Sequence, residues 1–415
     1  MQHNNYMDHS IFHLPNGIRV VFYPSRSVVT HTCLLIDAGS RDEKEGCYGI
    51  AHLIEHMLFK RTEKRNTSRI INRIESVGGE LNAYTTKEYT CIHASVLNEY
   101  LDRALDLFED IVFHSTFPED ELIKEKQVIF DEISSYLDSP EDSIMDDFED
   151  LVFSGSGLGH NILGDKRDLS TLTPRDIFSF LKENYHTDRM VIGVSGRYTP
   201  KKVKKLVERY FGEVKENTGL VKEDRVPHAL GRHIEVDKPI HQVHYMLGVR
   251  GYGIRHPHKT ELMLLNNILG GAGMSSILNL AIREKYGIAY TIDSHYSLYT
   301  DTGLFAIYMG TDREKYEKAI RLIYKELRKI KKQPLSSYQL QKAKQKIKGQ
   351  IALAEENRLG MIISDAKNIL DYDRVIHIDE VFDRIDRISE ESLVEVAQDI
   401  FHEDKFFSLK YLPIE

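Results

Sequence analysis

The chain has 415 residues, of which 41% are hydrophobic and 29% are charged, and its formal net charge at pH 7 is −9. This length allows two or three domains with buried cores, and the composition is typical of a soluble globular protein. The negative charge and the lack of a basic run argue against nucleic acid as a partner. No apolar run approaches the ~20 residues of a membrane span, so we expect no membrane association.

The N-terminus and the cysteines bear on the cellular compartment. Residues Met1–Asp8 contain neither the cationic nor the apolar region of a secretory signal, and the acidic Asp8 is unlike an organelle transit peptide. Three cysteines, Cys33, Cys47 and Cys91, form no C-x-x-C pair, which favours reduced structural thiols. We therefore expect a cytoplasmic protein.

The first half of the chain begins with a predicted β-hairpin. Asn16-Gly17 separates two apolar runs, Ser10–Leu14 and Ile18–Tyr23, and Asn-Gly between such runs is a strong turn signal. A buried strand is predicted near 31–38. Further elements follow in chain order: helices near 48–60, 67–77, 98–113, 118–138, 141–153 and 173–185, a strand near 190–194, and a lysine-rich helix near 200–210.

The second half repeats this plan after a polar linker. Strands are predicted near 232–236, 241–249, 288–299 and 303–309, and helices near 257–269, 275–286, 312–331 and 336–356. Residues 122–133 align with residues 340–351 without a gap, and six of the twelve positions are identical. We therefore predict an α+β fold of two homologous halves, each a mainly antiparallel sheet covered by helices. The expected domains are 1–215, a linker at 216–231, and 232–415.

The pentapeptide His52-Leu53-Ile54-Glu55-His56 carries the clearest chemical signal. Two histidines four residues apart project from one face of a helix, since four residues turn the chain by about 40° net. Two imidazoles in this arrangement can bind a divalent metal, and Glu55 lies close enough to act on water. The alternative without a metal is a helix with two surface histidines beside an acid.

A zinc site needs a third protein ligand, and the predicted helix at 118–138 offers two candidates. Glu125 and Glu132 are seven residues apart and share a face of that helix. One can bind the metal and the other can orient a ligand, although solvated surface acids are the alternative. The second half lacks the corresponding side chains together: its aligned residues are Met263, Asn266, Asn267, Ala343 and Gln350. A duplication that kept the chemistry in one copy explains this pattern.

Five segments in this order resemble the pitrilysin/insulinase (M16) zinc metallopeptidases. They are Gly39–Lys60, Gly78–Thr85, Glu125–Glu132, Leu269–Ser276 and Arg283–Tyr290. The resemblance spans nearly the whole chain and is greatest to the short single-unit branch, which includes mitochondrial processing peptidase. It implies one Zn²⁺ per chain, held by His52, His56 and Glu132. It also implies that Glu55 is the general base and that Glu125 supports a ligand.

The same resemblance implies how a peptide substrate is held. Arg283 and Tyr290 match a pair that holds the substrate near the scissile bond in this family. Asn82 and Ala83 match an edge strand to which an extended peptide adds. Ile277 stands where many members have Arg, which bears on substrate preference. Because the chain carries both the metal motif and the Arg/Tyr pair, we expect a homodimer that encloses a chamber.

Two other functions stay open on the sequence. Some relatives in this family are scaffold subunits that have lost catalysis, and a complete metal set disfavours that alternative. A metal-dependent hydrolase of small amides is the third possibility, and the segments that match peptide-binding elements argue against it. We therefore expect a zinc endopeptidase that cleaves extended or unfolded peptides.

Overall fold

The computed structural model describes residues 9–219 and 226–414. The prediction that concerned Met1–Asp8 lies outside these residues, as do positions 220–225 of the predicted linker. The chain forms two compact units. The first contains the described residues up to Ile133, those between Asn161 and Glu223, and Ala354–Ile376. The second contains Ser134–His160, the described residues between Asp224 and Leu353, and those from His377 onward.

The first unit is built on a six-stranded sheet with the order β1-β2-β6-β3-β5-β4. Its strands are β1 (Ser10–His13), β2 (Arg19–Pro24), β3 (Val29–Ile36), β4 (Glu80–Thr85), β5 (Thr90–Leu97) and β6 (Met190–Gly196). All neighbouring strands are antiparallel except β2 and β6, which are parallel. The predicted Asn16-Gly17 turn joins β1 to β2. The edge strand β4 pairs with β5 alone within this sheet.

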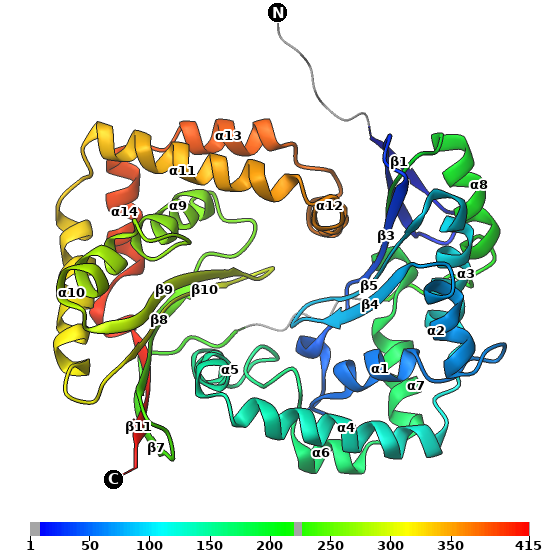
Figure 1. Cartoon of the computed structure of the whole chain (residues 1–415), viewed down its shortest axis with the longest axis horizontal. Helices are drawn as coiled ribbons and strands as arrows, with labels where there is room; N and C mark the ends of the chain where they lie inside the picture. Colours follow the sequence, from blue (N-terminus) through cyan, green and yellow to red (C-terminus); the bar gives the residue numbers. More distant parts are fainter. Residues whose placement is uncertain (1–8, 220–225, 415) are drawn as a thin grey trace, which may run out of the picture. The chain divides into compact units, whose positions relative to one another are not determined.

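Both faces of the first sheet are buried, which explains its long apolar runs. Val20 and Phe22 pack into a core with the helices of the first half, whereas Val21 and Tyr23 pack into a separate cluster on the opposite face. The helices of the first core are α1 (Ile50–Leu58), α2 (Thr67–Glu75), α3 (Leu101–Phe113), α4 (Glu119–Leu137), α6 (Lys166–Thr171), α7 (Pro174–Asn184) and α8 (Pro200–Phe211). Figure 1 shows α2, α3 and α8 together on one side of this sheet.

The second unit has a five-stranded sheet with the order β7-β11-β8-β10-β9. The strands are β7 (His233–Lys238), β8 (Val243–Gly251), β9 (Ala289–Leu298), β10 (Gly303–Thr311) and β11 (Phe407–Pro413). The helices that pack with it include α9 (Lys259–Leu269), α10 (Tyr316–Lys332), α11 (Ser337–Glu355), α13 (Ile378–Asp386) and α14 (Glu390–Ile400). A short π-helix spans Asn279–Glu284, where an ordinary α-helix was predicted.

The two units share one topology. The order β2-β6-β3-β5-β4 corresponds to β7-β11-β8-β10-β9, and in each the first two strands form the parallel pair. The aligned helices α4 and α11 keep a hydrogen-bonding lysine. The Lys126 amino group donates to the carbonyls of Ser170 and Leu172 near the end of α6. That of Lys344 donates to the carbonyls of Asp386 and Ile388 near the end of α13. The predicted α+β fold of two homologous halves is confirmed.

Each unit takes one helix from the other half of the sequence. Helix α5 (Pro140–Val152) packs on the second sheet, where Phe148 is fully buried with residues of β8, β10 and β11. Helix α12 (Arg358–Tyr372) packs on the first sheet, where Ile362 is fully buried against β2, β3 and β6. The predicted boundaries 1–215, 216–231 and 232–415 follow the order of the chain, and the compact units depart from them at these two helices. The reason is that each sheet has a second apolar face, which the exchanged helix covers.

Polar contacts fix α12 in place on the first sheet. The Tyr23 hydroxyl donates to the buried Asp365 carboxylate at 2.6 Å, and the Arg19 guanidinium donates to the Ile369 carbonyl at 2.7 Å. Burial, and then the charge of Asp365, raises the pKa of Tyr23, so the phenol stays protonated as a donor. Among the described helices, none has the length and apolar composition that crossing a membrane requires.

Candidate metal centre

Helix α1 presents two histidines at the surface of the first core. Its apolar residues Leu53, Ile54 and Met57 are fully buried, which fixes the rotation of the helix. The ring centroids of His52 and His56 lie 4.6 Å apart in an edge-on arrangement. The four-residue spacing therefore brings both imidazoles to one place, as predicted from the sequence.

Helix α4 brings Glu132, which lies 76 positions after His56 in the sequence, to the same place. The Glu132 Oε2 atom lies 3.9 Å from His52 Nε2 and 3.7 Å from His56 Nε2. Zinc bonds of about 2.0–2.2 Å in a tetrahedral site separate ligand atoms by roughly 3.4 Å, so small side-chain shifts are enough. Among the described residues, these three form the group of imidazole and carboxylate side chains close enough to hold one metal ion.

The donor set fits zinc in chemistry as well as in distance. Two imidazole nitrogens and one carboxylate oxygen are borderline ligands that zinc accepts, with a further position left for water or substrate. His52 is only 8% exposed, whereas the Glu132 side chain is 45% exposed, so the site opens to solvent on the Glu132 side. Burial, followed by the charge of His56, lowers the pKa of His52 to about 4. His52 is therefore neutral at pH 7, the form that binds a metal.

Glu125 contacts the Nδ1 side of the His56 ring and is itself paired with Lys60. His56 Nδ1 and Glu125 Oε2 lie 3.1 Å apart, and the Lys60 ammonium lies 2.5 Å from the other oxygen of Glu125. Burial would raise the pKa of Glu125, but the hydrogen bonds from His56 and Lys60 outweigh it and lower that pKa. A carboxylate held ionised at Nδ1 directs Nε2 of the same ring toward Glu132. Glu125 therefore lies beside His56, and its role in supporting a metal ligand stays a prediction.

Glu55 lies beside His56 and is held by the end of β4. The Thr85 hydroxyl donates to Glu55 Oε2 at 3.2 Å. Burial raises the pKa of Glu55, and the charge of His56 and the hydrogen bond from Thr85 oppose that rise. A carboxylate with a raised pKa is a stronger base than an exposed glutamate, which suits proton transfer from water.

Lys60 and Thr85 were not singled out from the sequence. Lys60 falls inside the helix predicted at 48–60, but α1 ends at Leu58 and Lys60 lies in the turn that follows, so helical spacing alone does not place its ammonium. Thr85 comes from a strand more than twenty residues away. Its contact with Glu55 depends on how β4 packs beside α1, which local sequence patterns do not encode.

The predicted peptide-binding residues lie on edge elements. Asn82 and Ala83 belong to the edge strand β4, and the Ala83 N–H bonds to the Asn82 side-chain oxygen at 2.8 Å. In the second unit, Arg283 is exposed in the last turn of the π-helix. Tyr290 lies on the edge strand β9 with 57% of its surface exposed, and its hydroxyl donates to Asp312 at 3.2 Å. Their roles toward a substrate stay predictions.

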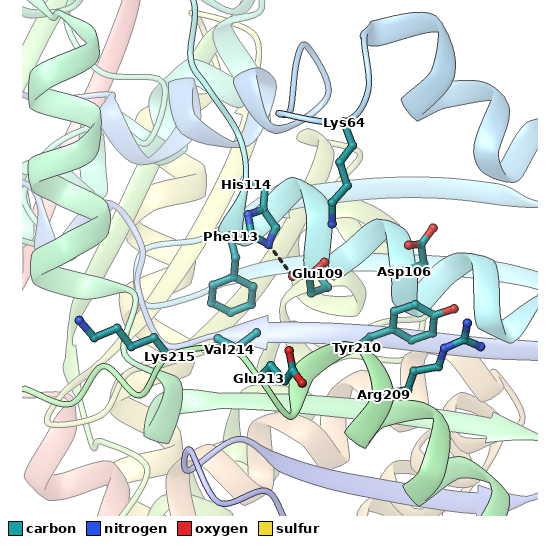
Figure 2. Close-up of a pocket in the computed structure, with 10 residues that line it drawn as sticks. All are labelled: Lys64, Asp106, Glu109, Phe113, His114, Arg209, Tyr210, Glu213, Val214 and Lys215. Atoms are coloured by element: carbon teal, nitrogen blue, oxygen red, sulfur yellow. Dashed lines mark hydrogen bonds and ion pairs between the residues drawn. The ribbon is translucent and has the colours of Figure 1, made fainter.

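A separate pocket of about 630 Å³ lies between α3, α8 and the segment that follows α8 (Figure 2). Its lining mixes charges of both signs, from Lys64, Glu109, Arg209 and Lys215, with the ring of Tyr210. His114 Nε2 lies 2.7 Å from Glu109 Oε1, so the two side chains in this pocket are hydrogen-bonded to each other. None of the predicted site residues lines it, so we do not place the chemistry in this pocket.

In the second unit, two amide side chains occupy the position that corresponds to the candidate metal centre. Asn267 and Gln350, which align with His56 and Glu132, form an amide hydrogen bond of 2.8 Å. The Gln350 amide also donates to the Ala272 carbonyl. A neutral hydrogen bond thus stands where an imidazole and a carboxylate meet in the first unit, and the helix pair keeps its packing without a metal site.

These features match the motif of the inverted zinc-peptidase class, with His-x-x-Glu-His on one helix and a distant glutamate on another. The model described as "Insulinase (Peptidase family M16)" matches residues 21–166, and the model "Peptidase M16 inactive domain" matches residues 171–347. The chain belongs to the M16 peptidase family, in its short single-unit branch. The second match covers much of the half that lacks the metal ligands.

Relatives match this chain over nearly the full length of both proteins. The "Uncharacterized zinc protease YmxG" of Bacillus subtilis is 34% identical over 398 residues, which cover 95% of this chain and 96% of that protein. An "Uncharacterized zinc protease" of Rickettsia felis is 33% identical over 400 residues, covering 94% and 95%. The crystal structure of a protease from Helicobacter pylori has the same fold, with a TM-score of 0.90, 24% identity, and coverage of 98% and 99%.

We expect Glu125→Ala to weaken zinc binding by about 10–100-fold, the usual effect of removing a partner that orients a histidine ligand. The change frees Nδ1 of His56 and leaves Lys60 without its carboxylate. Competition with a chromophoric chelator measures the dissociation constant. Glu121→Ala is the matched control, because Glu121 lies one turn earlier on α4 and pairs with Lys124. Equal zinc affinity in the two variants would contradict the role of Glu125.

Proposed function

We propose that the protein is a zinc-dependent endopeptidase that cleaves extended or unfolded peptides. The observation that carries this proposal is the meeting of His52, His56 and Glu132 from two helices. A fourth group, Glu55, lies next to them and is oriented by Thr85. The family membership of the chain and the names of its relatives support the same activity.

His52, His56 and Glu132 would hold a zinc ion, which when bound would supply Lewis acidity to polarise a carbonyl group and acidify water. Glu55 accepts the proton of the attacking water at its carboxylate and delivers it to the amine nitrogen that leaves. Thr85 keeps that carboxylate facing the reacting atoms. The pairing of Glu125 with Lys60 holds the ring of His56 so that Nε2 faces the site.

The edge strand β4 gives the proposal its substrate class. An extended peptide that adds to β4 forms main-chain hydrogen bonds with little demand on side chains, and folded proteins cannot supply such a strand. Ala83 lies at the middle of β4, and Thr85, which holds Glu55, ends it. A peptide on this edge is therefore directed toward the general base. Arg283 and Tyr290 supply guanidinium and phenol donors for the peptide or for a developing oxyanion.

One peptidase assay tests the proposal. The purified protein is incubated with an unstructured peptide that carries a fluorophore and a quencher, with and without a zinc chelator. We expect cleavage that chelation abolishes and that added zinc restores. No cleavage by protein with zinc bound would favour a catalytically silent scaffold subunit of the same family. Cleavage of a small amide but not of the peptide would point to a different hydrolase.

We expect Thr85→Val to lower kcat by about tenfold, with little change in KM. The variant removes a hydrogen bond to a charged group, and such bonds contribute about 1.5–3 kcal/mol. Thr85→Ser keeps the hydroxyl and should retain most of the activity. Steady-state kinetics with the fluorogenic peptide separates kcat from KM. A Thr85→Val enzyme with unchanged kcat would show that Glu55 needs no orientation by β4.

The active assembly that we propose is a cytoplasmic homodimer. Each chain carries both the metal ligands and the Arg283/Tyr290 pair, so no second kind of chain is required. Analytical ultracentrifugation of the active protein should give twice the mass of one 48.0 kDa chain. A monomer with full peptidase activity would refute the dimer.

A further inference from the structure

The residue that precedes helix α1 has no side chain with which to cap it. The residue before the helix is Gly49, whose φ of +94° lies in the left-handed region that favours glycine. A Cβ atom at Gly49 would lie 2.8 Å from the Leu163 carbonyl oxygen and 2.9 Å from the Gly164 Cα. A Cβ at Gly164 would in turn lie 2.4 Å from the Gly49 Cα. This backbone crossing requires glycine at the position where Ser, Thr, Asp or Asn usually caps a helix.

Glu43 supplies the missing cap from six residues earlier. Its two carboxylate oxygens accept from the backbone N–H groups of Gly49 and Ala51, each at 2.8 Å. The N–H of the intervening Ile50 bonds to the Cys47 carbonyl. Glu43 is only 8% exposed, so both of its bonds are sheltered from water and losing them would leave buried donors unpaired. A carboxylate at this end of the helix also complements the helix dipole.

The cap acts next to the first metal ligand. Ala51 directly precedes His52, and α1 has only nine residues, so its first turn carries this ligand. Asp168 adds a second acceptor just outside the helix, where its Oδ2 receives the N–H of Tyr48 at 3.2 Å. The backbone that sets the direction of His52 is therefore held by two carboxylates from outside α1.

We propose that Glu43 is a positioning residue for the metal centre, acting on His52 through the first turn of α1. The proposal rests on the zinc site of the proposed function. A general structural role would lower the stability of the fold alone. A positioning role also weakens metal binding by the folded protein and changes the geometry around the metal.

The experiment compares Glu43→Gln and Glu43→Ala with Asn66→Ala. Asn66 caps α2 in the same unit, where its side-chain oxygen accepts from the Arg69 N–H at 3.0 Å, and α2 carries no predicted ligand. Glutamine keeps one neutral acceptor and is the milder change. Thermal unfolding gives the folded fraction, competition with a chelator gives the zinc dissociation constant, and the visible absorption of Co²⁺ bound in place of zinc reports the ligand geometry.

We expect both Glu43 variants to raise the zinc dissociation constant of the folded protein, by about tenfold for Glu43→Gln and more for Glu43→Ala. Their Co²⁺ spectra should differ from that of the wild type. Asn66→Ala should lower the unfolding temperature and leave both metal readouts unchanged. Zinc binding by Glu43→Gln within twofold of the wild type, or a loss no larger than its unfolded fraction explains, would overturn the proposal. A wild-type protein that binds no zinc would instead overturn the proposed function, and this inference with it.

Discussion

Replacing Glu55 with Gln should lower kcat for peptide hydrolysis by roughly 10²–10⁴-fold, the range that general acid–base catalysis contributes. Glutamine has nearly the same size and can still accept the hydrogen bond from Thr85. It cannot take a proton from water. Zinc binding should be unchanged, because Glu55 is not among the three ligands that converge.

Two measurements on one preparation check this result. Zinc content by elemental analysis should match that of the wild type, and the initial rate with the fluorogenic peptide should fall. Glu45→Gln is the matched control, because it makes the same chemical change at an exposed position shortly before α1. A Glu55→Gln protein that cleaves at near wild-type rate would exclude Glu55 as the base, and a rate lost together with zinc would assign it a different role.

Glu132→Ala should reduce zinc affinity by more than the roughly 10–100-fold that follows the loss of an orienting partner. It removes the only carboxylate of the three-residue donor group, and the two remaining imidazoles both come from α1. The side chain is 45% exposed, so its loss leaves no large cavity and the fold should remain intact. Peptidase activity should then return only at high concentrations of added zinc.

Titration with zinc under chelator competition, followed by activity at each zinc concentration, measures both effects. Asp131→Asn is the matched control, since this exposed neighbour on α4 bonds to Gln127 rather than to a histidine. Circular dichroism of both variants establishes that the helices are retained. If Glu132→Ala bound zinc as tightly as Asp131→Asn, the third ligand would have to be another residue.

The parts of the site that were predictable are those set by local geometry. The pairing of His52 with His56 follows from helical spacing, and that spacing holds because buried Leu53, Ile54 and Met57 fix the face of α1. Glu132 was one of two candidate ligands on the helix predicted at 118–138, and the family resemblance distinguished it from Glu125. The hydrogen bond between Asn267 and Gln350 likewise lies where the alignment of the two halves placed its partners.

The parts that escaped prediction depend on packing between distant segments. Nothing in the sequence around Glu43 indicates that it caps a helix six residues later, because the need arises from the crossing of Gly49 and Gly164. The π-helix that precedes β9 has the composition of an ordinary helix. No element was predicted after residue 356, although α12, α13, α14 and β11 lie there. The exchange of α5 and α12 was also missed, since the apolar face of an amphipathic helix gives no sign of which sheet it covers.

That exchange makes the two halves of the sequence mutually dependent for folding. A fragment of residues 1–215 would lack α12 and leave Val21, Tyr23 and Leu35 facing water, and a fragment of residues 232–415 would lack α5 over Met246 and Tyr411. Each fragment alone should therefore aggregate, whereas the two expressed together can complement one another. If the fragments behave in this way, the half without the predicted metal ligands is needed for the other half to fold.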